Sequence, residues 1–324
     1  MTERTVWDVA IVGGGPAGLS AALHLAWHRR RVVVLDRVSG PLFFTLEKLW
    51  NVPGFAGASG VEIQKRLRAQ AIEQGAVVER ASIVRASGEL EAFRLEADDG
   101  RGWQARTLLL ATGVTRFHPT VDGDFRPCFA YAGKGNLYYC PDCEAPELFG
   151  KDTLVLAVGS ADSAAAMAIG LTRYARRVRV LLPPDAVLAE GLRPAVARRE
   201  VELVHGVLAG LEGERRQLSA VQLADGTRLE AEAFFVSTPA RGRTDLAEQL
   251  GVDLAPTGSH VAVASQRGNT NVPGVWVAGD LRPMTQQVAV ALGTGNLAAV
   301  MIDQYLRKRD VATPAGAPAA GTAT

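Results

Sequence analysis

The sequence predicts an α/β fold of two three-layer domains, with the second domain inserted into the first. Two observations predict it. A strand, a small-residue turn, a helix and another strand follow one another twice along the 324-residue chain, at Gly13 and again at Gly159. Each copy also contains unbroken aliphatic runs, which are typical of parallel strands covered on both faces. We therefore expect two Rossmann-like βαβ units in one chain.

The first copy opens with a strand at 8–12 and a glycine turn at 13–18. A helix of small residues follows to about Trp27, and the apolar run at 31–35 forms the next strand, which ends at Asp36. In the second copy, strands at 154–158 and 178–182 flank a turn at 159–164 and a helix at 165–173.

Other elements fill the space between and after these copies. Further strands are expected near 77–84, 93–97, 107–111, 201–204, 220–223 and 234–237, and at 271–280, where the strand ends in Gly-Asp. A largely apolar helix at 287–307 packs on the sheet. Residues 311–324 are Ala, Pro, Gly and Thr with one Val, and we expect them to form a disordered tail.

Composition excludes several classes of protein. With 48% hydrophobic and 21% charged residues and a formal charge of +1, the chain is globular and has no strong field for nucleic acid or anionic lipid. No apolar run reaches the roughly 20 residues that span a bilayer. The N-terminus lacks the pattern of a secretory signal. Three cysteines exclude a disulfide-stapled mini-protein, so we expect a cytoplasmic protein.

The first glycine turn has the spacing of a dinucleotide site. Gly13 allows a tight turn, Gly15 lets the backbone approach a pyrophosphate, and Gly18 permits close packing of helix on strand. The phosphates would meet the helix N-terminus, where free N–H groups favour anions. Asp36 is placed to accept a hydrogen bond from a ribose hydroxyl. The alternative is a tight turn that binds no ligand.

Cys140 and Cys143 are separated by two residues, a spacing that suits three kinds of chemistry. Such a pair forms a redox disulfide, supplies two metal ligands, or remains as two inert thiols. A structural zinc site needs two more ligands at short spacing, which Cys128, His118 and His205 do not provide. We therefore expect a dithiol–disulfide couple and no metal, with Cys128 structural.

An ordered set of motifs resembles a known family. The run Gly13-Gly-Gly-Pro-Ala-Gly18, the Ala-Thr-Gly at 111–113 and Gly279-Asp280 resemble the FAD-binding marks of flavoproteins with two dinucleotide-binding domains. The Asn-Val-Pro-Gly at 51–54, the Cys140–Cys143 motif and the ending at 287–295 narrow this resemblance to the low-molecular-weight thioredoxin reductases. It covers about residues 7–307 and implies FAD as cofactor and a homodimer.

The resemblance also implies which residues contact FAD. Asp280 corresponds to the aspartate that binds the ribityl chain, Asn51 and the backbone at 287–289 lie on the isoalloxazine side, and Val84 approaches the adenine. The expected cofactor residues are Gly13, Gly15, Pro16, Ala17, Gly18, Asp36, Arg37, Asn51, Val84, Thr112, Gly113, Gly279, Asp280, Gln287, Val288 and Ala289. Because Asp280 must return to the first sheet, the expected domains are 1–117 plus 244–310, which binds FAD, and 118–243.

Family roles extend to the cysteine motif. In the family, the second cysteine exchanges electrons with the flavin and the first attacks the substrate disulfide, which assigns Cys143 and Cys140 respectively. An aspartate usually follows the second cysteine as proton donor and acceptor, whereas this chain has Glu144. Glu144 takes that role if burial raises its pKa, and otherwise it is merely a solvated side chain.

The second unit departs from an NADPH site at two places. Ala161 stands where the second glycine is expected. Its methyl group would crowd a pyrophosphate and weaken binding of the nucleotide by about 1–3 kcal/mol. Leu182-Pro-Pro stands where the family carries His-Arg-Arg for the 2′-phosphate. Two lost charged hydrogen bonds bring the loss to about 4–9 kcal/mol, or about three to six orders of magnitude in affinity. The alternatives are drift within a working site, substitute cations from Arg193, Arg198 or Arg199, or a ribose contact from Asp185 that favours NADH.

A weakened NADPH site requires another electron donor. Ferredoxin-dependent thioredoxin reductases and a diflavin type resemble the family yet lack this site, so reduced ferredoxin or a second FAD is the expected donor. Aromatic residues flank the motifs and offer stacking surfaces for a second ring system, although core packing is the simpler explanation. These residues are Phe43, Phe44, Trp50, Tyr138 and Tyr139.

We expect a flavin-dependent disulfide reductase of the thioredoxin reductase type. It would pass electrons through Cys143 and Cys140 to a thioredoxin-like protein or a small disulfide. One alternative is an ordinary NAD(P)H-dependent disulfide reductase. The other is a flavin redox sensor with a stable disulfide and no turnover.

Overall fold

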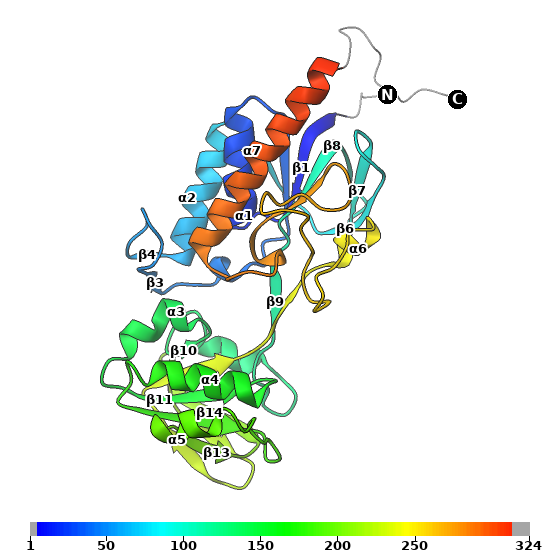
Figure 1. Ribbon diagram of the computed structural model, residues 1–324. Coiled ribbons are helices and arrows are strands. Elements are labelled where there is room, and N and C mark those ends of the chain that lie inside the picture. The colour runs from blue at the N-terminus through cyan, green and yellow to red at the C-terminus, as the bar shows by residue number, and fades with distance from the viewer. Residues whose placement is uncertain (1–4, 313–324) are drawn as a thin grey trace. The chain divides into compact units, whose positions relative to one another are not determined.

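The computed structural model describes residues 5–312, which divide into two compact units (Figure 1). The first unit contains the chain up to Gly40, residues Ile63–Val114 and the chain from Gly242 onward, and the second contains Pro41–Glu62 and Thr115–Arg241. Each unit is built on a parallel sheet, which confirms the predicted α/β fold class. Residues 41–62 group with the second unit, whereas we expected them in the first. The domain boundaries stay a prediction.

The first unit has a parallel core extended by an antiparallel meander. Strands β5, β2, β1 and β8 are parallel and adjacent in that order, and the start of β8 pairs with β7 and its end with β19. The strands are β1 (Val6–Val12), β2 (Val32–Asp36), β5 (Val77–Arg80), β6 (Ile83–Ser87), β7 (Phe93–Ala97), β8 (Gly102–Leu110) and β19 (Val275–Val277).

Alternating side chains of β1 explain why this sheet is covered on both faces. Ala10 and Val12 belong to a core cluster with Phe93 and Leu95 of β7, while the intervening Ile11 is fully buried toward the helix that carries Gly18. The helices lie together on one side of the strands (Figure 1). They are α1 (Pro16–Trp27), α2 (Gly60–Glu73) and α7 (Val288–Ala312), with the short α6 (Asp245–Gln249) and the 3₁₀ turn η4 (Gly279–Leu281) elsewhere.

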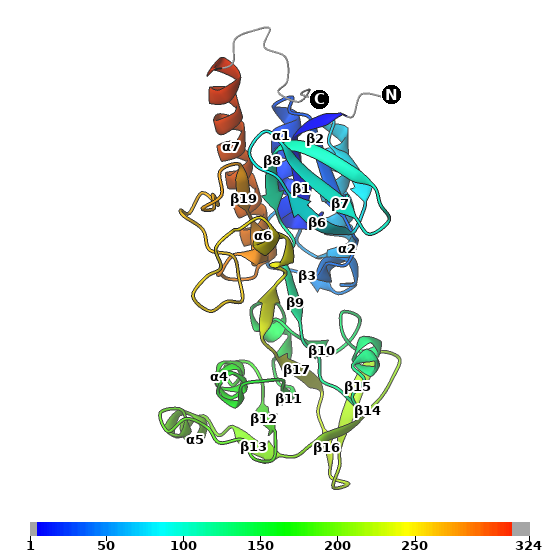
Figure 2. The same ribbon diagram turned by 90° about the vertical axis from the view of Figure 1, so that its right-hand side faces the viewer.

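The second unit places a helix and an antiparallel sheet on opposite faces of a five-stranded parallel sheet, ordered β10-β17-β11-β12-β13. Val155 and Phe235 face one cluster with α4, and Leu154 and Phe234 face another with strands β14–β16 (Figure 2). Its strands are β3 (Lys48–Leu49), β4 (Ala58–Ser59), β10 (Leu137–Tyr138), β11 (Asp152–Ala157), β12 (Arg177–Leu182), β13 (Glu202–His205), β14 (Leu208–Glu214), β15 (Gln217–Leu223), β16 (Arg228–Glu230) and β17 (Ala233–Ser237).

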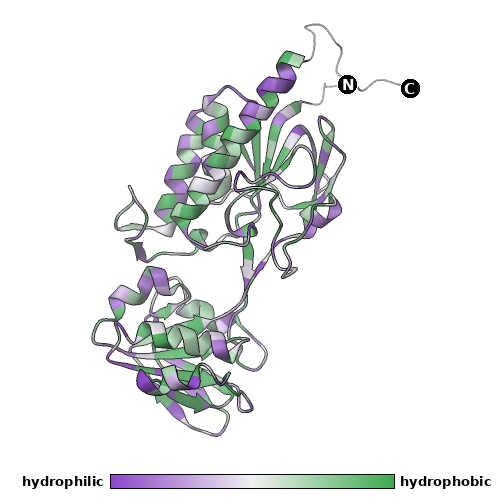
Figure 3. Ribbon diagram, viewed as in Figure 1, coloured by the Kyte–Doolittle hydropathy of each residue, from purple (hydrophilic) through white to green (hydrophobic). Residues whose placement is uncertain are grey.

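Short helices complete the second unit, and two paired strands join the units. The helices are α3 (Pro141–Glu144), α4 (Ala161–Leu171), α5 (Arg193–Arg198) and the 3₁₀ turns η1 (Pro41–Phe43), η2 (Arg126–Ala130) and η3 (Ala145–Leu148). The joining strands are β9 (Val114–Arg116) and β18 (Ala240–Gly242). Colouring by hydropathy shows green strands inside both sheets and purple on outward helix surfaces, the pattern of two separate hydrophobic cores (Figure 3).

Two expected segments fall at the ends of the described chain. The final helix, expected at 287–307, extends to Ala312. The tail expected at 311–324 otherwise lies outside the described residues. Among residues 5–312, no helix is both long and apolar enough to cross a membrane.

Candidate functional site

The first glycine turn is shaped by close backbone approaches. Gly13 has φ +109°, and a Cβ there would lie 2.2 Å from the carbonyl oxygen of Ala111. A Cβ at Gly18 would lie 1.9 Å from the carbonyl oxygen of Gly13. A Cβ at Gly15 would meet nothing within 4 Å, so the space above Gly15 is open. Gly13 and Gly18 are thus required by the fold, and Gly15 leaves room for a ligand.

Asp36 supplies the polar partner that a ribose would need. Its side chain is buried, and its Oδ1 accepts a hydrogen bond from the Val38 N–H at 3.1 Å. Its Oδ2 is also buried and has no hydrogen-bond partner among the described residues. A Cβ at Gly14 would lie 2.7 Å from that carboxylate, so Asp36 borders the turn. An unsatisfied buried acceptor beside an open turn fits the adenosine half of a dinucleotide.

Three further polar residues contact the glycine turn or the segment that follows Asp36, and the sequence motifs include only Arg37 among them. Gln64 of α2 is buried and donates through Nε2 to the carbonyl oxygen of Gly14, while its Oε1 has no partner among the described residues. Arg37 and Arg243 both donate to Ser39 Oγ, at 2.6 and 3.3 Å. Burial and the charge of Arg37 lower the pKa of Arg243. This pair of guanidinium groups favours an anion nearby.

The remaining expected cofactor residues of the first unit lie at element ends. Pro16 and Ala17 open α1, and Gln287, Val288 and Ala289 mark the start of α7. Thr112 donates to the carbonyl oxygen of Arg243 at 2.9 Å, and Gly113 accepts from the Arg243 N–H at 3.0 Å. The N–H of Gly279 donates to Thr294 Oγ1 at 3.0 Å, which fixes η4 and Asp280 against α7.

Two expected cofactor residues lie apart from this group. Val84 is half exposed on β6, and its carbonyl accepts from Gln249. Asn51 belongs to the second unit, where its Nδ2 donates to the Asp142 carbonyl at 3.4 Å. That contact ties the 51–54 segment to the cysteine motif. The cofactor roles of both residues stay predictions.

The cysteine motif forms one helical turn. Cys140 is the extended residue before α3, Pro141 occupies the first helical position, and Cys143 lies within the turn. Their sulfur atoms are joined as a disulfide, with a Cα–Cα distance of 5.3 Å. Sulfur and carboxylate atoms of Cys140, Cys143 and Glu144 all lie within 4.8 Å of one another. The structure therefore contains the predicted disulfide with an acid directly beside it.

Glu144 is poised to hold a proton. Its Oε2 accepts a hydrogen bond from the Cys140 N–H at 3.1 Å. Burial raises the pKa of Glu144 to about 8, against the lowering effect of that N–H, and Glu47 raises it further. Arg116 opposes the increase and Glu147 adds to it. A carboxyl with this pKa exchanges its proton near neutral pH, as an acid–base group must.

Cys128 and the two tyrosines before the cysteine motif lie in packed surroundings. Cys128 is buried, its thiol donates to the Pro119 carbonyl at 3.3 Å, and burial raises its pKa to about 11. Tyr139 contacts His118 Nδ1 through its hydroxyl at 2.7 Å, and Tyr138 packs on Phe235. Phe43 is half-buried, whereas Phe44 and Trp50 are exposed. Core packing therefore accounts for the two tyrosines.

The second glycine turn differs from the first in how its helix begins. Gly159 has φ +100° and borders Pro239. Ser160 caps α4, accepting a hydrogen bond from the Ser163 N–H at 3.2 Å. By contrast, α1 begins after Gly15, and no side chain of the described residues forms a capping hydrogen bond at its N-terminus. Ala161 is the first residue of α4, so this helix starts earlier than the expected 165.

A pocket of about 310 Å³ lies at the carboxyl ends of β11 and β12 in the second unit. In a doubly wound sheet this edge is where a nucleotide binds. Leu182, Pro183 and Pro184 line it, and its lining includes His118 but no Lys or Arg. Burial and Arg116 lower the pKa of His118, which favours its neutral form. Arg193, a candidate substitute cation, instead donates to the Leu188 carbonyl at 3.2 Å.

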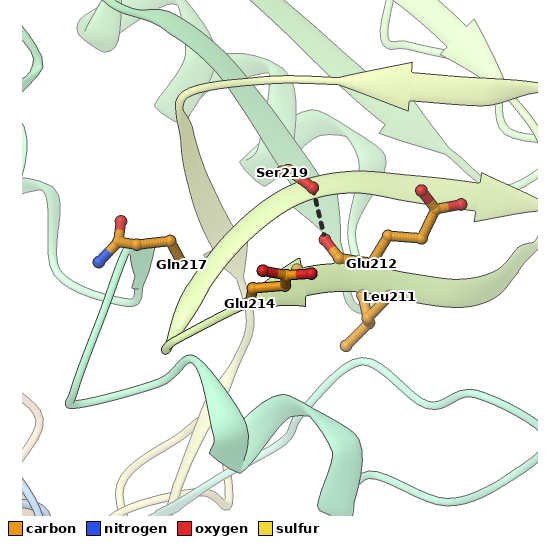
Figure 4. Close-up of a pocket in the computed structure, with 6 residues that line it drawn as sticks. Leu211, Glu212, Glu214, Gln217 and Ser219 are labelled. Carbon is orange, nitrogen blue, oxygen red and sulfur yellow. Dashed lines mark hydrogen bonds between the residues drawn. The ribbon is translucent and has the colours of Figure 1, made fainter.

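A second hollow in this unit has a different character. It lies on the β14–β15 hairpin and is lined by Leu211, Glu212, Glu214, Gln217 and Ser219 (Figure 4). Ser219 donates to the Glu212 carbonyl at 3.1 Å, and the Glu212 carboxylate pairs with Arg228 at 2.8 Å. The Glu212 carboxylate is thus paired, the Glu214 carboxylate is exposed to solvent, and the lining of this hollow includes no residue of the disulfide motif.

Comparison with known proteins agrees with this geometry. The model of the pyridine nucleotide-disulphide oxidoreductase family matches residues 7–295. A thioredoxin reductase of Mycolicibacterium smegmatis is 30% identical over 322 residues, covering 95% of this chain and 99% of its own length. The crystal structure of HlmI superposes with a TM-score of 0.86 at 27% identity and covers 96% of both chains. The atypical thioredoxin reductase TRi from Desulfovibrio vulgaris Hildenborough is 29% identical, with a TM-score of 0.51 over 94% of this chain and 99% of its own. The resemblance to thioredoxin reductases is thus confirmed.

Proposed function

Because this chain belongs to the pyridine nucleotide-disulphide oxidoreductase family, we propose that it is an FAD-dependent disulfide reductase of the thioredoxin reductase type. Its substrate would be the disulfide of a thioredoxin-like protein or of a small molecule. The observation that carries this proposal is the Cys140–Cys143 disulfide, with the Glu144 carboxyl within 4.8 Å of the sulfur atoms. A disulfide and a carboxyl whose pKa lies near neutral pH are the groups that thiol–disulfide exchange requires.

The first glycine turn would hold FAD. Gly13, Gly15 and Gly18 would form the cradle, Asp36 Oδ2 would accept from the adenosine ribose, and Arg37 would complement the negative charge of the pyrophosphate. Thr112, Gly113, Gly279 and Asp280, with the backbone at 287–289, would complete the site. When bound, FAD supplies a two-electron carrier that exchanges electrons with a disulfide.

The cysteines would divide the reaction between them. Cys143 would accept the electrons that open the disulfide, and Cys140 would attack the substrate as a thiolate. Glu144 would protonate the sulfur of Cys140 when the disulfide opens. It would take that proton back when Cys140 attacks the substrate, because a carboxyl with a pKa of about 8 serves in both directions near neutral pH.

The electron donor would not be NADPH. Ala161, the Ser160 cap and the pocket beside Leu182, Pro183 and Pro184, whose described lining includes no Lys or Arg, all disfavour a nucleotide with a 2′-phosphate. Reduced ferredoxin is the donor we propose, and a second FAD is the alternative. A homodimer, as the thioredoxin reductase family implies, is part of the same proposal.

Anaerobic mixing tests the proposal. NADPH, NADH and reduced ferredoxin are added separately while the visible flavin band is followed. We expect bleaching with reduced ferredoxin and none with either nucleotide, with dithionite as the positive control. Rapid bleaching by NADPH or NADH would make this an ordinary nucleotide-dependent reductase.

A disulfide assay separates an enzyme from a redox sensor. The chain is reduced chemically and then offered oxidised thioredoxin or a small aromatic disulfide. We expect turnover that Cys140→Ser abolishes and that Cys128→Ala leaves intact, because Cys128 lies outside the disulfide. A wild-type protein that keeps its reduced thiols in the presence of every disulfide would be a sensor.

A further inference from the structure

The pocket at the carboxyl ends of β11 and β12 has a lining that suits an uncharged ligand. Its volume is about 310 Å³, and the described residues that line it include no Asp, Glu, Lys or Arg. Leu156, Leu181 and Leu182 are buried at the two strand ends, and Val207 and Leu208 line it at the start of β14. A phosphate placed here would lose water without gaining a charged partner, whereas an apolar ring would gain by leaving water.

His118 supplies a hydrogen-bonding ring to this lining. Its Nδ1 atom lies 2.7 Å from the Tyr139 hydroxyl, which leaves Nε2 as the ring nitrogen that can bond to a ligand. Phe125 stacks on the ring at a centroid distance of 5.8 Å, and Phe129 meets it edge-on at 5.1 Å. Because burial and Arg116 lower the pKa of His118, its neutral ring offers one donor or one acceptor at that nitrogen. The imidazole is thus held in place by its neighbours and is uncharged.

The pocket lies at the same edge of the sheet as the cysteine motif. The strands β10, β17, β11, β12 and β13 are parallel neighbours, so their carboxyl ends meet at one edge. Cys140 follows the end of β10 by two residues, and the pocket lies at the ends of β11 and β12. Tyr139, whose hydroxyl contacts His118, directly precedes Cys140. One side-chain hydrogen bond therefore joins the lining of the pocket to the chain of the cysteine motif.

We propose that this pocket binds an uncharged aromatic small molecule, whose ring packs on the ends of β11 and β12 and whose polar atom hydrogen-bonds to His118. Small-molecule pockets commonly combine a large apolar surface with a few placed polar groups, as this one does. The inference goes beyond the proposed disulfide reductase, which assigns this pocket no ligand. It concerns binding alone, so its test needs no electron donor and no turnover.

A matched pair of small molecules tests the proposal on the full chain with its disulfide intact. The first, 1-naphthol, is uncharged and has one hydroxyl, and the second, 1-naphthyl phosphate, carries the same ring with a phosphate on that oxygen. We expect calorimetric titration to show binding of 1-naphthol and at least roughly tenfold weaker binding of 1-naphthyl phosphate. His118→Phe keeps an aromatic ring and removes the nitrogen, so the affinity for 1-naphthol should fall roughly five- to tenfold.

A charge added to the lining locates the site. Val207 is exposed and lines the pocket, so Val207→Arg adds a cation there without disturbing the core. We expect this variant to bind 1-naphthol more weakly and 1-naphthyl phosphate more tightly than wild type, which reverses the preference. Val187→Arg is the matched control, because Val187 is also exposed but is not among the described residues that line the pocket. It should leave both affinities unchanged.

Equal affinity of the wild-type chain for the two molecules would overturn the proposal, as would tighter binding of the phosphate or no binding of 1-naphthol. Displacement of 1-naphthol by an equal concentration of NADPH would make this a nucleotide pocket instead. Equal effects of Val207→Arg and Val187→Arg would also contradict the site. If Val207→Arg folds poorly, the NMR signals of the His118 ring in the wild-type chain decide. They should shift when 1-naphthol is added, and unchanged signals would rule out the contact with His118.

Discussion

The two glycine turns of this chain begin with the same backbone requirement and end with different surroundings. Gly13 and Gly159 both adopt positive φ, at +109° and +100°. In the first turn, Gly15 borders open space and α1 lacks a side-chain cap within the described chain. In the second, Ala161 carries a methyl group and Ser160 caps α4. The acidic Asp36 after the first pair of strands also contrasts with Leu182, Pro183 and Pro184 after the second.

The difference separates what a glycine turn does for folding from what it does for a ligand. Gly13 and Gly159 allow the strand to turn into the helix, and both copies keep them. The second glycine of the motif lets a phosphate approach the backbone, and the second copy has Ala161 at that position. In α4 the Ser160 side chain accepts from the Ser163 N–H, so one of the free N–H groups at this helix N-terminus already has a protein partner.

The largest effect should come from making the second turn like the first. The triple variant Ala161→Gly, Pro183→Arg and Pro184→Arg removes a methyl group and adds two cations at exposed positions. Relief of the methyl crowding and two new charged hydrogen bonds to the 2′-phosphate should together raise NADPH affinity by about three orders of magnitude or more. Calorimetric titration of NADPH measures the change, and NADPH-driven bleaching of the flavin measures its consequence. Ala161→Gly alone is the matched control and should recover roughly ten- to hundredfold. Unchanged affinity in the triple variant would place the nucleotide defect elsewhere.

Substituting alanine for Gly13 or Gly159 compares how much each turn contributes to the free energy of unfolding. A Cβ at Gly13 would lie 2.2 Å from backbone oxygen, whereas a Cβ at Gly159 would lie 3.3 Å from the Pro239 ring. Gly13→Ala therefore adds a backbone clash to the strain of positive φ and should destabilise the chain by about 4 kcal/mol or more. Gly159→Ala adds mainly the strain and should cost about 1–3 kcal/mol. Urea unfolding measures both, and equal losses would contradict this account.

The same contrast explains what could be predicted from the sequence. The two turns, the β-branched strands and the Cys140–Cys143 pair are local patterns with fixed spacing, so they were predicted correctly. Gln64 and Arg243 lie near their partners, Gly14 and Ser39, only after folding, because these segments are distant in sequence. Nothing in spacing marks them.

Errors at element ends have local causes. The α4 helix starts at Ala161 rather than 165 because Ser160 caps it, a signal hidden inside the expected turn. The pattern does not predict β14 and β16, because β14 contains two glycines and two glutamates and β16 has only three residues, so neither shows a clear period.

The next prediction concerns Glu144 and how the free energy of unfolding depends on pH. Glu144 has a pKa of about 8 in the folded chain and near 4.5 when exposed, so the folded state binds its proton more tightly. Stability from this group is complete below about pH 4.5 and is lost as the pH rises through 8. Glu144→Gln should thus match wild type near pH 5 and exceed it by about 3–5 kcal/mol near pH 9.

Urea unfolding at three pH values, with the disulfide intact, checks the Glu144 prediction. Glu147→Gln serves as the control, because an exposed substitution should change stability by less than about 0.5 kcal/mol at each pH. A Glu144→Gln variant that differs from wild type equally at pH 5 and pH 9 would mean that Glu144 is ionised throughout. The second unit would then keep the disulfide without its proton donor.

The smallest expected effect is on FAD affinity, from substitution of Asp36 at the end of β2. Asp36→Asn keeps the acceptor for the Val38 N–H but replaces one carboxylate oxygen, so the ribose loses a charged acceptor. Such a hydrogen bond contributes about 1.5–3 kcal/mol, and FAD affinity should fall roughly ten- to hundredfold. Asp185→Asn is the matched control, because exposed Asp185 follows the corresponding strand of the second unit and should leave FAD affinity unchanged. Flavin release on dilution, followed by fluorescence, measures both. Equal FAD affinity in Asp36→Asn and wild type would remove the ribose contact from the first turn, and the contrast between the turns would then rest on Gly15 and Ala161 alone.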